Sequence, residues 1–98
     1  MARGEITLRA QADLERLFEF RAQTDLVRAL RELLSGRQAL GMLAEHPLVG
    51  RLVEDGRREL VLLRGSSGYV AKYRWLARDD VVLILAMRSQ REVGYLEE

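Results

Sequence analysis

Hydrophobic and polar positions change their spacing about halfway along the 98-residue chain. In the first half, apolar residues recur every three or four positions, as on one face of an α-helix. One such pattern covers residues 12–21 and a longer one covers residues 26–43. In the second half, three short runs have the composition of β-strands: residues 58–64, 69–76 and 81–88. The pattern therefore predicts two helices followed by three strands.

Short polar or proline-containing segments set the limits of the helices. Residues 6–9 alternate apolar and polar side chains and are expected to form a short first strand. Thr24 and Asp25 separate the two helical patterns, and Asp25 is suited to cap the second helix. His46 and Pro47 end that helix, because the residue before a proline avoids the helical backbone conformation. The short connection between the helices predicts an antiparallel helical hairpin.

The three later strands are joined by links too short to hold a helix. Residues 65–68 and 78–80 are turn sequences, and such links leave neighbouring strands antiparallel. Residues 48–56 form a connector between the hairpin and these strands. The run 81–88 is apolar on both faces, which is typical of an interior strand. The predicted fold is α+β in the order β-α-α-β-β-β. The helical hairpin packs on one face of a twisted, mainly antiparallel four-stranded sheet, in a single domain of residues 1–98.

The middle strand presents two chemically different faces. One face is largely aromatic and suits the core side of a sheet packed against helices; its residues are Tyr69, Ala71, Tyr73 and Trp75. A platform for stacking nucleic-acid bases is the alternative use of these rings. The other face alternates apolar and cationic side chains: Val70, Lys72, Arg74 and Leu76. Because two helices can cover only one face, we expect the second face to stay partly open or to be covered by residues 89–98.

An apolar strip bordered by cations is expected on this second face. We assign to it these residues of the last three strands: Arg58, Leu60, Leu62, Arg64, Lys72, Arg74 and Arg88. Such a strip is typical of a surface that binds a protein partner. Clustered cations also suit a phosphate backbone or an acidic peptide, whereas scattered solvated charges are the alternative without a function.

The composition excludes several classes of function. The chain has 16 Lys and Arg against 15 Asp and Glu, a net charge of +1, which excludes a polybasic, histone-like protein. All the basic residues except Lys72 are arginine, which suits bidentate contacts to carboxylate and phosphate but also follows from an arginine-biased genome. The absence of cysteine excludes disulfides, zinc ribbons, iron–sulfur clusters and thiol catalysis.

No segment has the pattern of a membrane span or a secretory signal. The longest wholly apolar run, residues 81–87, is far too short to cross a bilayer. The first residues of the chain contain no apolar stretch of the kind that a secretory signal needs. We therefore expect a soluble, cytoplasmic protein.

Three motifs are better explained by structure than by chemistry. The only histidine, His46, ends a helix and is expected to interact with the last helical carbonyls rather than to bind a metal or act in catalysis. The Gly-Ser-Ser-Gly segment 65–68 lacks the lysine and the following helix of a phosphate loop. Asp79 and Asp80 have no further carboxylates at the spacing of a metal site, and they suit a turn. We expect no metal and no cofactor.

Four segments follow one another in a recognisable order. They are residues 45–51 (EHPLVGR), 58–61 (RELV), 67–74 (SGYVAKYR) and 82–92 (VLILAMRSQRE). Together with the order of the elements, they resemble the RelE/ParE superfamily of toxins from bacterial type II toxin–antitoxin modules. The similarity spans nearly the whole chain and is closest to the ParE-like branch.

The resemblance implies a growth-inhibiting toxin that a cognate antitoxin holds inactive in a hetero-oligomeric complex. ParE-type toxins act on DNA gyrase and block replication, whereas RelE-type toxins cut mRNA in the ribosome. Val70 stands where RelE-like nucleases commonly carry an arginine, and Ser89 stands where many relatives carry a histidine. Lysines dominate the RelE site, but here only Lys72 is present. We therefore expect inhibition of gyrase by binding. A ribosome-dependent mRNA endonuclease is the first alternative, and an inactive interaction module is the second.

Candidate site residues follow from the strand pattern and from the resemblance. We assign target binding to four arginines: Arg58, Arg74, Arg88 and Arg91. We assign antitoxin contacts to Leu60, Leu62, Arg64 and Lys72. For the nuclease alternative, the resemblance gives the catalytic roles to Lys72, Arg91 and Tyr95. The antitoxin is expected to lay an apolar helix beside the helical hairpin and to add an extended segment along the sheet. No membrane partner is expected.

Overall fold

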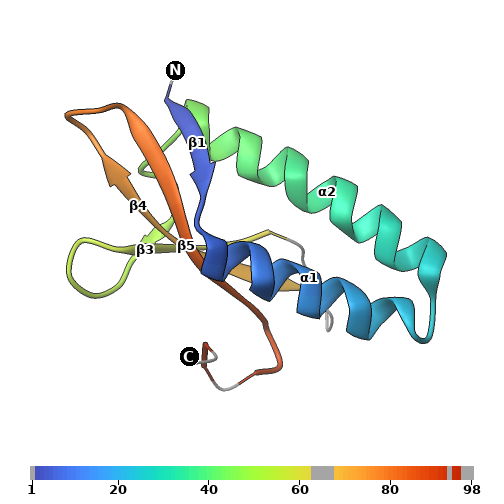
Figure 1. Cartoon of the computed structure of the whole chain (residues 1–98). Helices are drawn as coiled ribbons and strands as arrows, with labels where there is room; N and C mark the ends of the chain where they lie inside the picture. The colour runs from blue at the N-terminus through green and yellow to red at the C-terminus, as the bar shows by residue number, and fades with distance from the viewer. Residues whose placement is uncertain (1, 63–67, 93, 96–98) are drawn as a thin grey trace.

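Two helices pack against a five-stranded mixed sheet in the computed structural model, which describes residues 2–62, 68–92 and 94–95 (Figure 1). The helices are α1 (Leu8–Ala22) and α2 (Leu26–Glu45). The strands are β1 (Arg3–Ile6), β2 (Arg51–Leu52), β3 (Arg58–Val61), β4 (Tyr69–Leu76) and β5 (Val81–Ser89). The predicted α+β class and helical hairpin are confirmed, and the helices run side by side in Figure 1.

Side-chain caps set the starts of both helices. The Thr7 hydroxyl accepts a hydrogen bond from the Ala10 N–H at 3.1 Å, so that α1 begins at Leu8. The predicted first strand exists, but its bounds of 6–9 are wrong, because β1 covers Arg3–Ile6 and α1 begins at Leu8. The predicted cap of α2 is confirmed, since the Asp25 carboxylate accepts from the Arg28 N–H at 3.0 Å.

The strands are ordered β1-β5-β4-β3-β2, with β1 parallel to β5 and all other pairs antiparallel. β5 pairs with strands on both sides, which confirms that it is an interior strand. The predicted sheet of four strands gains a fifth, because Arg51 and Leu52 in the connector pair with the start of β3. A strand of two residues is too short to give a periodic sequence signal.

The core fills the space between the sheet and the helical hairpin. Its fully buried members include Leu43 of α2, Tyr73 of β4 and Met87 of β5. The Tyr73 hydroxyl donates to the Pro47 carbonyl and accepts from the Gly50 N–H, both at 2.8 Å. A Cβ at Gly50 would lie 2.6 Å from the Tyr73 ring, so only glycine allows the connector to approach this side chain.

The aromatic face of β4 is the core face, as predicted. Tyr69, Ala71 and Tyr73 are buried, and Trp75 packs against the same cluster. These rings are therefore core residues and not a platform for stacking bases. Their partners in β3 lie on the same side, because directly opposed residues of an antiparallel pair share a face.

We predicted that the even-numbered positions between 58 and 64 lie on the side of the sheet that the helices leave uncovered. This prediction is wrong. Arg58 pairs with Tyr73 and Leu60 pairs with Ala71, so both lie on the core side. Leu62 is buried in the core cluster, and Arg64 lies outside the described residues. We use the name open face for the side of β3, β4 and β5 turned away from the core. Its residues are Glu59, Val61, Val70, Lys72, Arg74, Leu83, Ala86 and Arg88.

A β-bulge in β5 decides which of its side chains reach the open face. Lys72 pairs with Ala86, but the next residue, Tyr73, pairs with Ile84, so that Leu85 is an extra residue. The extra residue inverts the alternation along the strand. Ile84 lies in the core before the bulge and Met87 lies in the core after it, which turns Arg88 to the open face opposite Val70.

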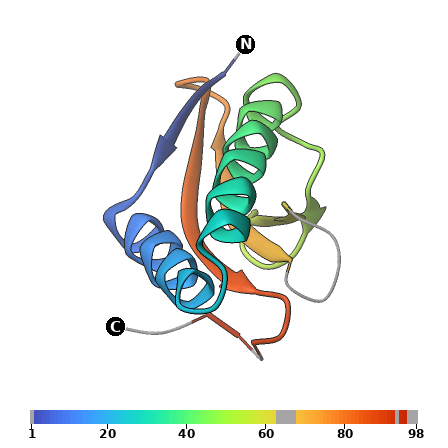
Figure 2. The same ribbon diagram turned by 90° about the vertical axis from the view of Figure 1, so that its right-hand side faces the viewer.

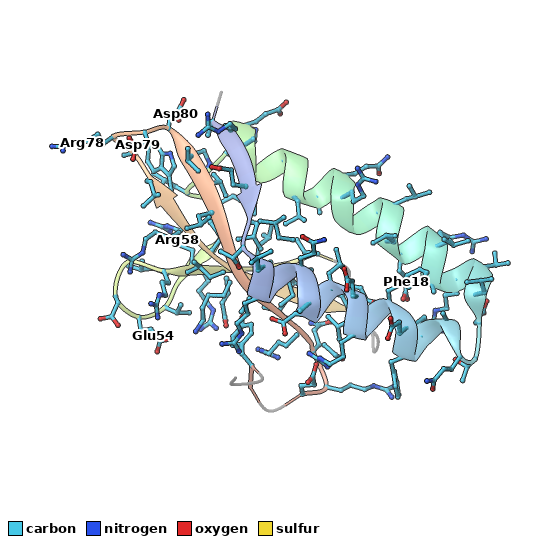
Figure 3. The ribbon with its side chains drawn as sticks, in the orientation of Figure 1. Phe18, Glu54, Arg58, Arg78, Asp79 and Asp80 are labelled. Carbon is cyan, nitrogen blue, oxygen red and sulfur yellow. The ribbon has the colours of Figure 1, made fainter. Side chains whose placement is uncertain are left out.

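His46 and the two aspartates of the β4–β5 turn occupy the positions predicted for them, at a helix end and in a turn. The backbone N–H of His46 donates to the Met42 carbonyl at 2.9 Å and ends α2. Arg78, Asp79 and Asp80 lie together at the tip of the β4–β5 turn (Figure 3). Asp80 has a φ of 51°, a left-handed conformation that aspartate tolerates better than most residues. The predicted turn at residues 65–68 lies mostly outside the described residues.

Candidate functional site: the open face of the sheet

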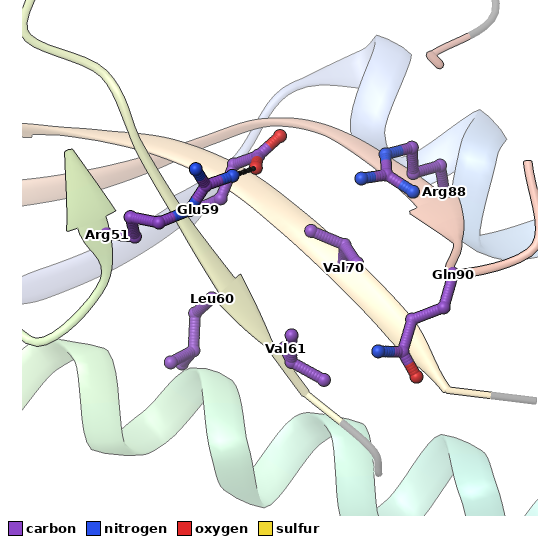
Figure 4. Close-up of a pocket in the computed structure, with 7 residues that line it drawn as sticks. All are labelled: Arg51, Glu59, Leu60, Val61, Val70, Arg88 and Gln90. Atoms are coloured by element: carbon purple, nitrogen blue, oxygen red, sulfur yellow. Dashed lines mark hydrogen bonds and ion pairs between the residues drawn. The ribbon is translucent and has the colours of Figure 1, made fainter. Parts of the chain in front are cut away.

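An apolar strip between two arginines crosses the open face. Val61 and Val70 are directly opposed on β3 and β4, and Arg88 lies opposite Val70 on β5 (Figure 4). Arg51 borders the strip on the other side, where it donates to Glu59 at 2.9 Å. A cavity of about 460 Å³ lies over these side chains. The predicted arrangement of apolar residues between cations therefore exists, but odd-numbered residues of β3 supply it.

Tyr95 covers the middle of the open face. Its hydroxyl donates to the Glu59 carboxylate at 2.7 Å. Its ring centroid lies 4.6 Å from Lys72 Nζ and 5.3 Å from Arg88 Cζ, within the range of cation–π contacts. One residue of the C-terminal segment thus covers part of the open face, while the Val61 side chain remains exposed.

A second cavity of about 310 Å³ is lined in part by Tyr95. Three of its side chains are cationic, namely Arg9 of α1, Arg57 of the connector and Lys72 of β4. The buried Arg57 Nε has no hydrogen-bond partner among the described residues. Lys72 Nζ donates to the Glu54 carboxylate at 2.8 Å. The cavity therefore combines convergent positive charge with an aromatic wall.

Among the residues that the structure describes, cations outnumber carboxylates around the two cavities. The cations are Arg9, Arg51, Arg57, Lys72 and Arg88, and the carboxylates that line the cavities or pair with these cations are Asp13, Glu54 and Glu59. The excess of positive charge gives the open face a chemical preference for anionic groups. The arginines favour planar carboxylate or phosphate groups because each guanidinium can donate two parallel hydrogen bonds.

Two titratable groups of the open face have shifted pKa values. Burial raises the pKa of the Tyr95 phenol well above its ordinary value of 10.0, and the hydrogen bond to Glu59 raises it further. The phenol therefore stays protonated at neutral pH. The hydrogen bond from Lys72 lowers the pKa of Glu54 below its ordinary value of 4.5, so this carboxylate stays charged.

The four arginines assigned to target binding do not form one cluster. Arg74 and Arg88 lie on the open face, and Arg74 donates to the Asp55 carbonyl. The Arg88 guanidinium donates to the carbonyls of Ser89 at 3.1 Å and Glu92 at 3.2 Å. The other two arginines lie elsewhere.

Arg58 lies on the core side of the sheet, where it donates to the carbonyls of Leu48 at 3.3 Å and Gly50 at 2.9 Å. In Figure 3, Arg58 lies apart from Glu54, whose carboxylate accepts a hydrogen bond from Lys72 on the open face. Arg91 lines a third cavity, of about 510 Å³, beside Phe20 of α1. Of the three residues assigned to a nuclease, the structure therefore brings together only Lys72 and Tyr95.

Sequence reasoning missed Glu59 on the open face, and Arg9 and Arg57 beside it. Arg9 was assigned to a first strand but lies in α1, and Arg57 lies in the connector, to which no site was assigned. Glu59 and Val61 could have been found from the hairpin itself. A loop with an even number of residues, as predicted at 65–68, pairs even positions of one strand with odd positions of the next.

A second exposed apolar surface lies on α2, on the side turned away from the core. Val27, Leu30 and Leu34 recur at helical spacing and are all exposed. We call these three residues the outer strip. The exposed cations Arg31 and Arg37 lie beside it along the helix. An apolar stripe with basic borders on a helix is suited to an amphipathic partner helix with acidic borders.

The described residues contain neither a metal site nor a membrane span. Over the described ranges, no three His, Cys, Asp or Glu side chains are grouped so that they could hold a metal ion. No described helix is both long enough and apolar enough to cross a bilayer.

Comparison with known proteins identifies relatives of this architecture. The family model of the ParE toxin of the type II toxin–antitoxin system parDE matches residues 5–94. Among solved structures, the chromosomal ParDE toxin–antitoxin system from P. aeruginosa superposes with a TM-score of 0.75 at 22% identity, covering 91% of this chain and 96% of that one. The intact RelBE toxin–antitoxin complex from E. coli superposes with a TM-score of 0.65 at 20% identity, covering 94% and 100%. No curated protein matches the chain significantly.

Proposed function

Because the chain belongs to the ParE toxin family of type II toxin–antitoxin systems, we propose that it inhibits growth by binding DNA gyrase and blocking replication. In this proposal the toxin acts in the cytoplasm, and a cognate antitoxin neutralises it by direct binding. The open face of the sheet is the surface that engages gyrase.

The observation that carries this proposal is the composition of the open face. Val61, which is exposed, and Val70, which is buried beside it, form an apolar strip between Arg51 and Arg88, and a cavity lies over them. Protein interfaces combine an apolar centre with a polar rim in the same way, and arginine is enriched in them. The excess of cations favours an acidic surface on the partner.

The environment of Tyr95 supports binding over RNA cleavage. A general base must accept the proton of the ribose 2′-hydroxyl, and its pKa should lie near the working pH. The Tyr95 hydroxyl instead donates to Glu59, and burial raises its pKa. Arg91, the third residue assigned to a nuclease, lines a different cavity. The open face thus lacks a suitable base among the residues proposed for cleavage.

A pair of assays on the purified, antitoxin-free protein tests the proposal. We expect loss of plasmid supercoiling by gyrase, or trapped cleavage complexes, while labelled mRNA in a translation reaction stays intact. Arg88→Ala should weaken the inhibition at least tenfold. Arg37→Ala, which removes an exposed arginine from α2, is the matched control and should have no effect.

The opposite result would assign a different target. Cut mRNA with normal supercoiling would replace the proposal with a ribosome-dependent nuclease. Intact mRNA with normal supercoiling, at concentrations that saturate antitoxin binding, would identify the chain as an interaction module without activity against gyrase.

We propose the outer strip of α2 as the docking surface for the antitoxin helix. The strip is apolar and exposed, and its neighbours Arg31 and Arg37 suit acidic borders on that helix. Leu34→Asp should weaken the toxin–antitoxin complex at least tenfold, measured by calorimetry with the antitoxin of the same module. Leu8→Asp, on an even more exposed leucine of α1, is the control. Equal affinities for both variants would mean that the antitoxin helix binds a surface other than the outer strip.

A further inference from the structure

Asp13 on α1 is a buried carboxylate for which the binding function described above has no use. Its side chain contacts strand β5 rather than solvent, and only 6% of the residue is exposed. The Asp13 Oδ2 atom accepts a hydrogen bond from the backbone N–H of Met87 at 2.9 Å. A carboxylate in this position needs a structural reason, because burying charge is unfavourable unless it is paired.

The Asp13 carboxylate lies where the edge of β5 has no neighbouring strand to pair with. β1 pairs with β5 only as far as Ile84, where the chain turns into α1. Thr7 continues the edge by one step, since its backbone N–H donates to the Ile84 carbonyl and its hydroxyl donates to the Leu85 carbonyl. Beyond that point α1 lies beside β5 in place of a strand (Figure 2). In a longer strand pair, a backbone carbonyl of the neighbouring strand would accept the hydrogen bond from the Met87 N–H. Here the Asp13 carboxylate accepts it instead.

Two arginines one turn away on either side offset the buried charge. Arg9 Nε and Arg16 Nη2 each lie 3.9 Å from an Asp13 oxygen. These distances are too long for hydrogen bonds but short enough for attraction in a poorly hydrated site. Both guanidinium groups therefore lie close enough to attract the buried Asp13 carboxylate.

The hydrogen bond falls directly after the bulge that aims Arg88. Leu85 is the extra residue, and the alternation along β5 is inverted from Ala86 onward. Met87 points into the core, so its neighbour Arg88 must point to the opposite face. A contact that holds the Met87 backbone therefore also sets the direction of Arg88.

We propose that Asp13 is a positioning residue, which holds the bulge of β5 in place and thereby directs Arg88 into the open face. This inference rests on the proposed function only in so far as Arg88 contacts the target. The placement of Arg88 itself can be measured without any target.

The first test measures that placement by NMR of the isolated protein. Asp13→Ala removes the acceptor, whereas Asp13→Asn keeps an oxygen that can accept from Met87. In Asp13→Ala we expect the Met87 amide to exchange with solvent at least tenfold faster. The side-chain protons of Arg88 should lose the ring-current shift caused by Tyr95. Asp13→Asn should keep both signals close to those of the unmodified protein.

A matched control separates positioning from general loss of stability. Asp25→Ala removes the cap of α2, which is distant from β5 in the fold and should leave both Arg88 signals unchanged. Unchanged signals in Asp13→Ala, or equal changes in Asp25→Ala, would overturn the proposal. If Asp13→Ala does not fold, Asp13→Leu, which fills the space without offering an acceptor, takes its place in the same comparison.

The second test is a double-mutant cycle on gyrase inhibition. If Asp13 acts through Arg88, Asp13→Ala should add no further loss to Arg88→Ala, whereas Asp25→Ala and Arg88→Ala should be additive. Additive losses for Asp13 and Arg88 would overturn the proposal. If Arg88→Ala alone leaves inhibition intact, the proposed target surface fails, and the NMR comparison still decides the placement.

Discussion

The two faces of the sheet use the same strands in opposite ways. On the core side of β4, the buried ring of Tyr73 packs between the strands and the hairpin, and its hydroxyl holds the connector. On the open side, Lys72 and its neighbours meet carboxylates and the ring of Tyr95 in ion pairs and cation–π contacts. Packing fixes the first face, whereas charge pairs at the surface of the second contribute little to stability. If the open face binds the target as proposed, alternate residues of one strand carry stability and binding.

The largest difference between the faces should appear when a core side chain is shortened. Leu43 is 0% exposed, and Leu43→Ala should reduce the free energy of unfolding by about 2–5 kcal/mol, because it leaves a cavity that the core cannot fill. Leu34 lies on the same helix but is 61% exposed, and Leu34→Ala should change stability by no more than about 0.5 kcal/mol. Urea denaturation of both variants provides the comparison.

The next largest difference in the free energy of unfolding should separate Tyr73→Phe on the core side from Tyr95→Phe on the open face. Tyr73→Phe leaves the Gly50 N–H and the Pro47 carbonyl without their buried partner, and should destabilise the protein by about 1–3 kcal/mol. Tyr95→Phe removes a hydrogen bond only from Glu59, which keeps its contact with Arg51 at 2.9 Å. Its effect on the free energy of unfolding should be clearly smaller. Equal losses would mean that Tyr95 is as structural as Tyr73.

The open face should respond in binding and not in stability. Val61→Asp places a carboxylate at the exposed member of the apolar strip, so stability should change by no more than about 0.5 kcal/mol. Inhibition of gyrase should nevertheless fall about tenfold, or 1.4 kcal/mol, because the strip forms the centre of the proposed interface. Leu52→Asp on β2, also exposed, is the control for an unspecific effect of charge. A similar loss in both variants would argue against the strip.

The smallest expected effect is the dependence of stability on alkaline pH. Burial raises the pKa of Tyr69, Tyr73 and Tyr95 above the ordinary value of 10.0. Since the folded protein holds these protons more tightly than the unfolded chain, their contribution is complete below pH 10 and is lost as the pH rises further. Tyr95→Phe should therefore show a shallower fall of melting temperature above pH 10 than the unmodified protein. Identical profiles would contradict the pKa assigned to Tyr95.

Much of the fold could be predicted from local patterns. The helical hairpin, the cap at Asp25 and the bounds of β4 follow from periodicity and from residues that act on their immediate neighbours. The resemblance to the RelE/ParE superfamily, drawn from four short segments, agrees with the family model that matches residues 5–94. These features depend on residues that are close together in the chain, so they can be recognised from the amino-acid sequence alone.

The composition of the open face depended instead on contacts between distant residues. The register of β3 against β4 moved Arg58 and Leu60 to the core side, although the strand itself was predicted. Arg88 reaches the open face only because Leu85 is an extra residue in β5, a feature that a uniformly apolar run does not reveal. Which face a side chain occupies is set by pairing across strands, and this pairing joins residues far apart in the chain. The sequence by itself determined the elements and the family, and the tertiary structure alone decided which side chains share the open face.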